Sequence, residues 1–159
     1  MHLREGETIL RIFHHHPTPF VFQILKVLLA TLPFFLLLFW FQESVEGSTY
    51  LVANLVVFLI FSLVIVYLSL IYWLDKLIVT NLRVVHVDWK YLTVRDEQEA
   101  LLEDIQDVKT HELGFLSYFR VFDYGRIKID TASSHVTLEF IDSPDPEGIR
   151  RYIYHVRNA

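Results

Sequence analysis

The segment 50–85 reads YLVANLVVFLIFSLVIVYLSLIYWLDKLIVTNLRVV, and it holds the two features that decide the fold. Its first part, Tyr50 to Leu74, carries no charge and is rich in Leu, Val, Ile and Phe. A helix rises about 1.5 Å per residue, so about 20 residues cross a hydrocarbon layer of about 30 Å. We therefore expect a transmembrane helix that leads almost directly into short β-branched runs.

A second apolar stretch, Pro19 to Phe41, lies earlier in the chain and is also long enough to span a bilayer. The loop 42–49 between the two stretches has two Glu and no Lys or Arg, whereas Lys and Arg precede the first stretch and follow the second. Because positive flanks stay in the cytoplasm, we expect both termini inside the cell. The predicted organisation is an interfacial N-terminal segment (1–18), a transmembrane hairpin (19–74; helices about 19–41 and 50–74) and a cytosolic domain (75–159).

The composition agrees with a membrane protein. The chain has 159 residues, of which 53% are hydrophobic and 15% aromatic, too apolar for a soluble protein of this size. It contains no cysteine, which excludes disulfides, thiolate nucleophiles and Cys-based metal sites. The first apolar stretch lacks a small-x-small cleavage site and is followed by another, so we expect it to remain in the protein.

The segment from Asp75 onward shows the patterns of a small α+β domain. Short β-branched runs flank Thr80 and Asn81, a break expected for a hairpin turn. Residues 126–130 and 136–140 alternate polar and apolar, as half-buried antiparallel strands do. Residues 98–112 are ambiguous between one helix and two strands broken near 103–104.

A terminal helix is predicted from its start signals and its spacing. Asp145 can cap it, Pro146 suits its first position, and Glu147 favours the positive end of the helix dipole. Apolar residues then recur at helical spacing and should close one side of the sheet: Ile149, Tyr152, Ile153 and Val156.

Three segments in sequence, LIVTNLRVV (77–85), LLEDIQDV (101–108) and DYGRIKIDT (123–131), resemble the bacterial pleckstrin-homology-like domains that follow paired transmembrane helices. The resemblance covers about residues 70–157. It implies a bent antiparallel sheet or barrel of seven strands, capped by a C-terminal helix, in a protein of the prokaryotic plasma membrane. It also favours strands over a helix for residues 98–112. The residues that carry it are expected to be structural: Thr80, Asn81, Arg83, Ile105, Val108, Tyr124 and Gly125.

The charge balance limits what such a domain would bind. Residues 75–159 contain 11 Lys and Arg against 15 Asp and Glu, whereas anionic headgroups and nucleic acids call for a basic cluster. Phosphoinositide binding is therefore not supported, and no nucleic acid is expected. No G-x-S-x-G, H-E-x-x-H or glycine-rich phosphate loop is present, so we expect neither an enzyme nor a cofactor.

Histidine and aromatic clusters supply the remaining candidate sites. His14, His15 and His16 are imidazoles beside the first apolar stretch, but they lack further metal ligands, so we expect a solvated interfacial role and no metal. The other histidines, such as His86, are expected to be surface or hairpin residues and not ligands. The segment 114–122 is dense in aromatics; burial is the default, and membrane or partner contact is the alternative. Its candidate contact residues are Phe115, Leu116, Tyr118, Phe119 and Phe122.

Two functions fit these observations. The leading one is a non-catalytic, membrane-anchored interaction or scaffold module that binds the lipid bilayer and also protein partners or copies of itself. The alternative is a small oligomeric transport component with a regulatory cytosolic domain, which would need polar residues in the membrane. The intramembrane polar candidates are Lys26, whose amine can reach the headgroups, and Asn54 and Ser62, which could equally join helices.

Overall fold

The structure, a computed structural model, describes residues 2–112, 124–132 and 137–158. It divides into two compact units. The helical unit is the segment 19–70, and the sheet unit combines the segments 1–18 and 71–159.

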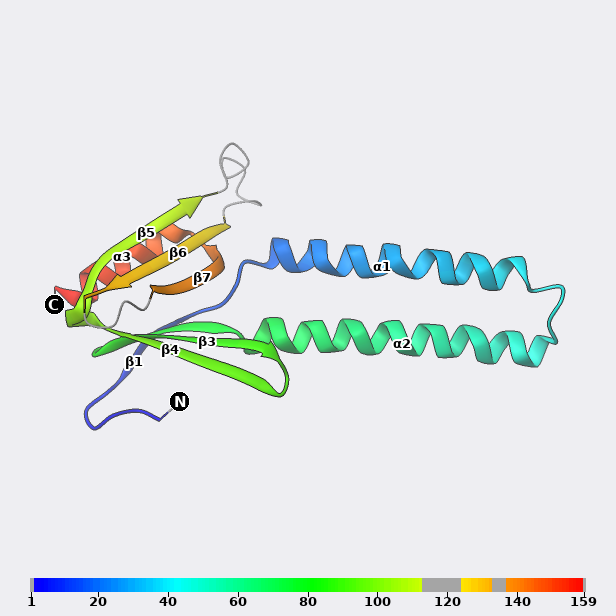
Figure 1. Ribbon diagram of the computed structural model, residues 1–159, viewed down its shortest axis with the longest axis horizontal. Coiled ribbons are helices and arrows are strands. Elements are labelled where there is room, and N and C mark those ends of the chain that lie inside the picture. The colour runs from blue at the N-terminus through cyan, green and yellow to red at the C-terminus, as the bar shows by residue number, and fades with distance from the viewer. Residues whose placement is uncertain (1, 113–123, 133–136, 159) are drawn as a thin grey trace. The chain divides into compact units, whose positions relative to one another are not determined.

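The helical unit is a pair of long helices, α1 (Pro17–Trp40) and α2 (Gly47–Leu74), which lie side by side in Figure 1. Their bounds lie within three residues of those predicted. Both are long and apolar enough to cross a membrane. Most of their large apolar side chains are exposed, and the rings of Phe34 and Phe61 touch across the pair at 5.3 Å between centroids. An apolar exterior is what a helix pair would present to lipid.

The sheet unit contains two antiparallel sheets and a C-terminal helix (Figure 1). The first sheet has the order β1-β2-β3-β4 and the second β5-β6-β7. A 3-10 turn, Leu102–Asp104, joins the sheets, so the ambiguous middle segment forms two strands, as the family resemblance implied. The elements are β1 (Ile9–Phe13), β2 (Lys76–Thr80), β3 (Arg83–Tyr91), β4 (Val94–Leu101), β5 (Ile105–Glu112), β6 (Tyr124–Thr131), β7 (Thr137–Pro144) and α3 (Pro146–Arg157).

Strand β1 comes from the N-terminal segment, which the sequence analysis set apart from the domain at 75–159. Its residues pair antiparallel with β2, for example Phe13 with Leu77 and Ile12 with Ile78. The segment 1–18 therefore does not form a separate element, because its strand completes an edge of the first sheet. Among the described residues, six of the seven strands come from the domain at 75–159 and one from this segment.

The core lies between the two sheets and α3. The predicted alternation in β6 and β7 is confirmed: Ile127 pairs with Phe140 and Ile129 with Leu138, and all four side chains are fully buried. Each such side chain contributes about 1.5–3 kcal/mol through burial. The larger cluster adds residues from both sheets, the 3-10 turn and α3: Leu77, Val79, Val84, Ala100, Leu102, Ile105, Val108, Ile149 and Ile153.

Helix α3 begins as predicted. The side chain of Asp145 accepts a hydrogen bond from the backbone N–H of Gly148 at 2.9 Å, which satisfies one of the free donors of the first turn. Ile149 and Ile153 are buried against the sheets, and Tyr152 and Val156 pack at the margin of the core.

Gly125, at the start of β6, occupies a place where no side chain fits. The β6–β7 register shifts between Gly125 and Ile127. A Cβ atom at Gly125 would lie 2.3 Å from the backbone oxygen of His111 and 2.8 Å from Cγ of Pro146. A register shift of the kind a β-bulge produces and a close backbone approach therefore meet at this glycine.

We expect Gly125→Ala to destabilise the sheet unit by about 3 kcal/mol, because the neighbouring carbonyl belongs to the backbone and has little freedom to move. The free energy of opening of β5 and β6 amides, measured by hydrogen exchange of the full chain in detergent, would report the loss. Gly47→Ala is the matched control, since nothing lies within 4 Å of a Cβ atom there. Equal exchange in the two variants would contradict the expectation.

Candidate functional site

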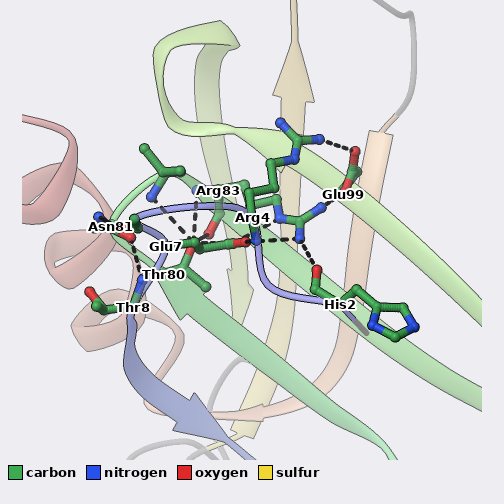
Figure 2. A network of polar contacts seen from close by, with 10 residues as sticks. His2, Arg4, Glu7, Thr8, Thr80, Asn81, Arg83 and Glu99 are labelled. Carbon is green, nitrogen blue, oxygen red and sulfur yellow. Dashed lines mark hydrogen bonds and ion pairs between the residues drawn. The ribbon is translucent and has the colours of Figure 1, made fainter.

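The N-terminal residues His2–Thr8, here called the N-terminal clasp, are held against the β2–β3 hairpin by a buried ion pair (Figure 2). Nε of Arg83 donates to Oε1 of Glu7 at 2.8 Å, and Nη2 of Arg83 donates to Oε2 of Glu7 at 3.0 Å. The Glu7 side chain is fully buried and that of Arg83 is 8% exposed. A two-pronged contact of this kind is among the stronger charged hydrogen bonds in proteins.

The Glu7 carboxylate accepts further hydrogen bonds, so that each of its two oxygens has two donors. The backbone N–H of Arg4 donates to Oε2 of Glu7 at 2.7 Å, and the Thr80 hydroxyl lies 2.9 Å from Oε1. The hydrogen bond from Arg83 is the main cause that lowers the pKa of Glu7 to about 2, although burial opposes it. Glu7 therefore stays ionised throughout the physiological range.

Asn81, in the hairpin turn, binds the backbone of the clasp on both sides of Glu7. Its Oδ1 accepts from the N–H of Thr8 at 2.8 Å, and its Nδ2 donates to the carbonyl of Gly6 at 3.0 Å. The Asn81 backbone N–H also donates to the Thr8 carbonyl at 3.2 Å. Gly6 adopts φ 77°, in the left-handed region that glycine reaches most readily.

The clasp also touches strand β4 through Glu99. Arg4 Nη2 donates to Oε1 of Glu99 at 2.9 Å, and Nη1 of Arg83 donates to Oε2 of the same residue (Figure 2). Arg83 Nη2 further reaches the His2 carbonyl at 2.9 Å. Arg83 is therefore the hub that ties β3, β4 and the N-terminus together.

A second group of residues lies where α2 passes into β2. It consists of the polar side chains of His15, Asp75 and His86 and the ring of Phe140, and is here called the junction cluster. Oδ1 of Asp75 is 3.1 Å from Nε2 of His15 and 3.1 Å from Nε2 of His86. The His15 ring stacks on Phe140 with centroids 4.6 Å apart, and His86 meets the same ring edge-on. Asp75 and the two imidazole side chains are each at most 14% exposed.

His15 is bound to acceptors at both ring nitrogens. Its Nδ1 lies 2.6 Å from the backbone oxygen of Ile141, and its Nε2 faces the Asp75 carboxylate. Burial favours the neutral ring, but the hydrogen bond and charge of Asp75 outweigh it and raise the pKa of His15. For Asp75, burial is likewise opposed by hydrogen bonds from His15 and His86, and its pKa is lowered to about 2. The geometry therefore suits an imidazolium beside a carboxylate.

The backbone around His15 and His16 is fixed as well. The Tyr72 hydroxyl donates to the His15 carbonyl at 2.8 Å, and the His16 N–H donates to the Asp142 carbonyl at 2.7 Å. His16 also stacks on Tyr124 at 5.5 Å between ring centroids. The residues that lead into α1 are thus anchored to the end of α2 and to β6 and β7.

A hollow of about 510 Å³ opens on the face of β5 and β6 and is lined by Lys109, Thr110, His111, Arg126 and Lys128. Neighbouring acids reduce its positive charge, because Lys109 pairs with Asp130 at 2.6 Å and Arg126 with Glu139 at 2.9 Å. Such a mixed surface suits a protein partner better than a strongly anionic ligand.

Residues 22–157 match the family model described as Bacterial PH domain. The chain belongs to this family. The matched residues include α2 and most of α1 but not the N-terminal clasp or β1.

Two solved structures are similar to this bacterial PH domain protein. One is a DUF1696 family protein with a pleckstrin-homology domain from Shewanella loihica PV-4, at 16% identity and a TM-score of 0.41, covering 52% of this chain and 70% of that one. The other is a pleckstrin homology domain from Shewanella amazonensis SB2B, at 18% identity and a TM-score of 0.41, covering 52% of this chain and 66% of that one, just under two thirds. No curated protein matches the chain.

The motif residues expected to be structural fall into two groups. Ile105 and Val108 are buried in the core, and Tyr124 and Gly125 begin β6. The polar residues Thr80, Asn81 and Arg83 bind the clasp, a role the sequence analysis missed. The run Ile9–Phe13, rich in aliphatic residues, was the available signal for a strand there.

The histidine expectations need correction. His15 was expected to be solvated, but its side chain is largely buried because Asp75 and Phe140 provide partners for a polar ring. His86 was expected to be a surface or hairpin residue; it lies in the β2–β3 hairpin, where its side chain is also largely buried. His14 is exposed. Among the described residues, no group of three or more His, Asp or Glu could hold a metal ion.

The remaining candidates lie in the helices or outside the described residues. Lys26 is exposed on α1, and Ser62 is half-buried on α2. Asn54 donates from Nδ2 to the Tyr50 carbonyl of its own helix at 2.9 Å. The predicted contact residues Phe115, Leu116, Tyr118, Phe119 and Phe122 lie outside the described residues, so their role stays a prediction.

Proposed function

We propose that this bacterial PH domain protein is a membrane-anchored, non-catalytic interaction module whose sheet unit works at the cytoplasmic face of a prokaryotic plasma membrane. The observation that carries the proposal is how the two helices connect to the sheet. Three residues separate β1 from α1, and a single residue separates α2 from β2. Strands β1 and β2 are hydrogen-bonded neighbours. Both connections therefore leave from adjacent strands, which lie about 5 Å apart.

These short connections support a role for the helices beyond tethering. The junction cluster fixes the backbone at His15 and the carboxylate of Asp75, so the two linkers have little freedom. Attachment through two short linkers instead of one lowers the entropic cost of binding a partner at the membrane. PH-like domain families are generally non-catalytic, in keeping with an interaction role.

The edge strand β1 is the surface we assign to protein partners or to a second copy of the chain. Its side chains Ile9, Leu10 and Ile12 are each more than 40% exposed, and an uncovered edge offers backbone groups for strand pairing. The opposite edge, β4, carries Arg95, Asp96, Glu97 and Glu99, which discourage such pairing.

The transport alternative gains no support from the helical unit. Besides Asn54, two further polar side chains of the helices bond to carbonyls of their own helix: Thr31 to Leu28 at 2.6 Å and Ser69 to Ile65 at 2.8 Å. Side chains satisfied in this way do not call for a hydrated path.

Topology labelling tests the anchoring. The chain has no cysteine, so Ser44→Cys in the loop between the helices and Asn158→Cys after α3 are unique labelling sites. We expect an impermeant maleimide to label Ser44→Cys in intact cells and Asn158→Cys only after permeabilisation, with the protein resisting carbonate extraction. Release by carbonate would refute the anchoring, and the reverse labelling pattern would refute the cytoplasmic placement.

The partner surface is tested by cross-linking in detergent followed by native mass spectrometry, alone and with a membrane extract. Leu10→Asp should lower the amount of complex, because it places a charge on the exposed β1 edge, whereas Gln98→Asp on β4 should leave it unchanged. A monomer without partner in both variants and in the parent chain would refute the interaction role.

A further inference from the structure

The β3–β4 hairpin tip, residues 89–94, is an apolar and aromatic projection at the end of the first sheet where β2 begins. β2 begins one residue after α2, and the β2–β3 register places its first residue, Lys76, opposite Val87. Strand β3 runs on to Tyr91, four residues past this point. At about 3.3 Å per residue, the strand extends about 13 Å beyond the start of β2.

The tip exposes apolar groups that the protein leaves uncovered. Tyr91 is 60% exposed, Val94 42% and Leu92 37%, and Trp89 is half-buried beside them. Tyr and Trp at such a place are typical of the boundary between headgroups and hydrocarbon. The headgroup region of one leaflet is about 5–7 Å thick, about half the length by which β3 extends past the start of β2.

The charges at the tip indicate what kind of contact it makes. Lys90 pairs with Asp96 at 2.5 Å, and Arg95 pairs with Glu97 while its guanidinium lies 5.7 Å from the centre of the Trp89 ring. Each cation has its own acid, so attraction to anionic lipid is largely cancelled. The apolar side chains are left as the binding groups.

We propose that the β3–β4 tip inserts into the headgroup layer of the bilayer that holds α2, as a second and charge-independent membrane contact of the sheet unit. This inference rests on the proposed function, since it needs α2 to cross a membrane. The sheet unit would then contact the bilayer at two places, the β3–β4 tip and the α2 junction. Two contacts would limit its rotation about Asp75.

A pair of matched leucines tests the proposal in the full chain. Leu92 at the tip is 37% exposed, and Leu82, in the β2–β3 turn at the other end of the sheet, is 40% exposed. Each is replaced separately by cysteine and labelled with NBD, and the protein is reconstituted into vesicles of phosphatidylcholine and phosphatidylglycerol. Nitroxide-labelled phosphatidylcholine then reports contact with lipid, and iodide on both sides reports contact with water.

We expect the nitroxide lipid to quench the NBD fluorescence of Leu92→Cys several-fold more strongly than that of Leu82→Cys. Iodide should quench the fluorescence of Leu92→Cys several-fold less than that of Leu82→Cys. The same result is expected in vesicles of phosphatidylcholine alone, because the tip charges are compensated. Val94→Cys should repeat the result and serves as the readout if Leu92→Cys does not fold.

Three outcomes would overturn the proposal. Equal iodide quenching at Leu92→Cys and Leu82→Cys would show the tip in water. Protection from iodide without nitroxide quenching would assign the tip to a protein contact, and loss of nitroxide quenching in phosphatidylcholine alone would assign it to an anionic headgroup. Carbonate extraction of the same vesicles separates these results from failure of the proposed anchoring, because an extracted protein was never held by α2.

Discussion

Replacing Arg83 with methionine should destabilise the sheet unit by about 3–5 kcal/mol, because it leaves the Glu7 carboxylate buried without its charged partner. Glu7 is fully buried and depends on Arg83 for two of its hydrogen bonds. The same substitution removes the contacts of Arg83 to Glu99 and to the His2 carbonyl. Hydrogen exchange of β1 and β2 amides, measured on the full chain in detergent, gives the free energy of opening that should fall.

Arg95→Met is the matched control for this substitution. Arg95 lies in the same sheet and is also ion-paired, but it and Glu97 are each 37% exposed. A solvated ion pair contributes less than about 1 kcal/mol to stability. Its loss should therefore hardly change the hydrogen exchange of the β1 and β2 amides. The double variant Glu7→Gln/Arg83→Met should recover part of the loss, because no unpaired charge remains buried. Similar exchange in Arg83→Met and Arg95→Met would contradict a central role for the buried pair.

The sequence was sufficient to predict the parts of the fold that depend on local pattern. Alternation in β6 and β7, the turn at Thr80 and Asn81, and the cap at Asp145 are all set by neighbouring residues, and the structure has each of them. The two long helices follow from the length of the apolar stretches and from their near absence of charge, with Lys26 in α1 as the exception. These are short-range features, for which residue type and spacing carry enough information.

The features that were missed depend on contacts between distant residues. Glu7 and Arg83 are 76 positions apart, and nothing in the segment around Glu7 distinguishes it from a solvated acid. His15 similarly receives its acceptors from Asp75 and Ile141, which are far along the chain. A polar side chain near an apolar stretch is more often solvated than buried, so the sequence favoured the wrong environment for His15.

The polar motif residues Thr80 and Asn81 have a second role besides forming the turn. Thr80 and Asn81 suit a tight turn, but the same side chains also bind Glu7, Gly6 and Thr8 of the clasp. The hairpin therefore both reverses the chain and selects the N-terminal strand. In this protein the strand that precedes α1 is positioned by the strand pair that follows α2.

The junction cluster makes the stability of the sheet unit depend on pH in a defined direction. The pKa of His15 is raised in the folded state, so its contribution is complete below the unfolded value of about 6.5 and is lost as the pH rises through the folded value. The pKa values of Asp75 and Glu7 are lowered to about 2, so their contributions are complete above about 4.5 and are lost as the pH falls toward 2. The unit should therefore be most stable between about pH 4.5 and 6.5.

Asp75→Asn should remove most of the decrease in stability between pH 6.5 and 8, because the carboxylate that holds His15 protonated is gone. At pH 6 the variant should be less stable by about 2 kcal/mol, since a pKa lowered from 3.8 to about 2 corresponds to a free energy of this size in a mostly buried group. Hydrogen exchange of β2 and β7 amides at a series of pH values, corrected for the intrinsic exchange rate, measures both effects.

Asp130→Asn provides the control for this titration, because Asp130 is also ion-paired and its pKa is also lowered, yet it pairs with Lys109 on the surface. It should leave the slope between pH 6.5 and 8 unchanged. His15→Asn should remove that slope at least as fully as Asp75→Asn does, because the group with the raised pKa is gone. A parent protein whose stability rises from pH 6.5 to 8 would show that His15 is neutral when folded, and its two acceptors would then have to be satisfied in another way.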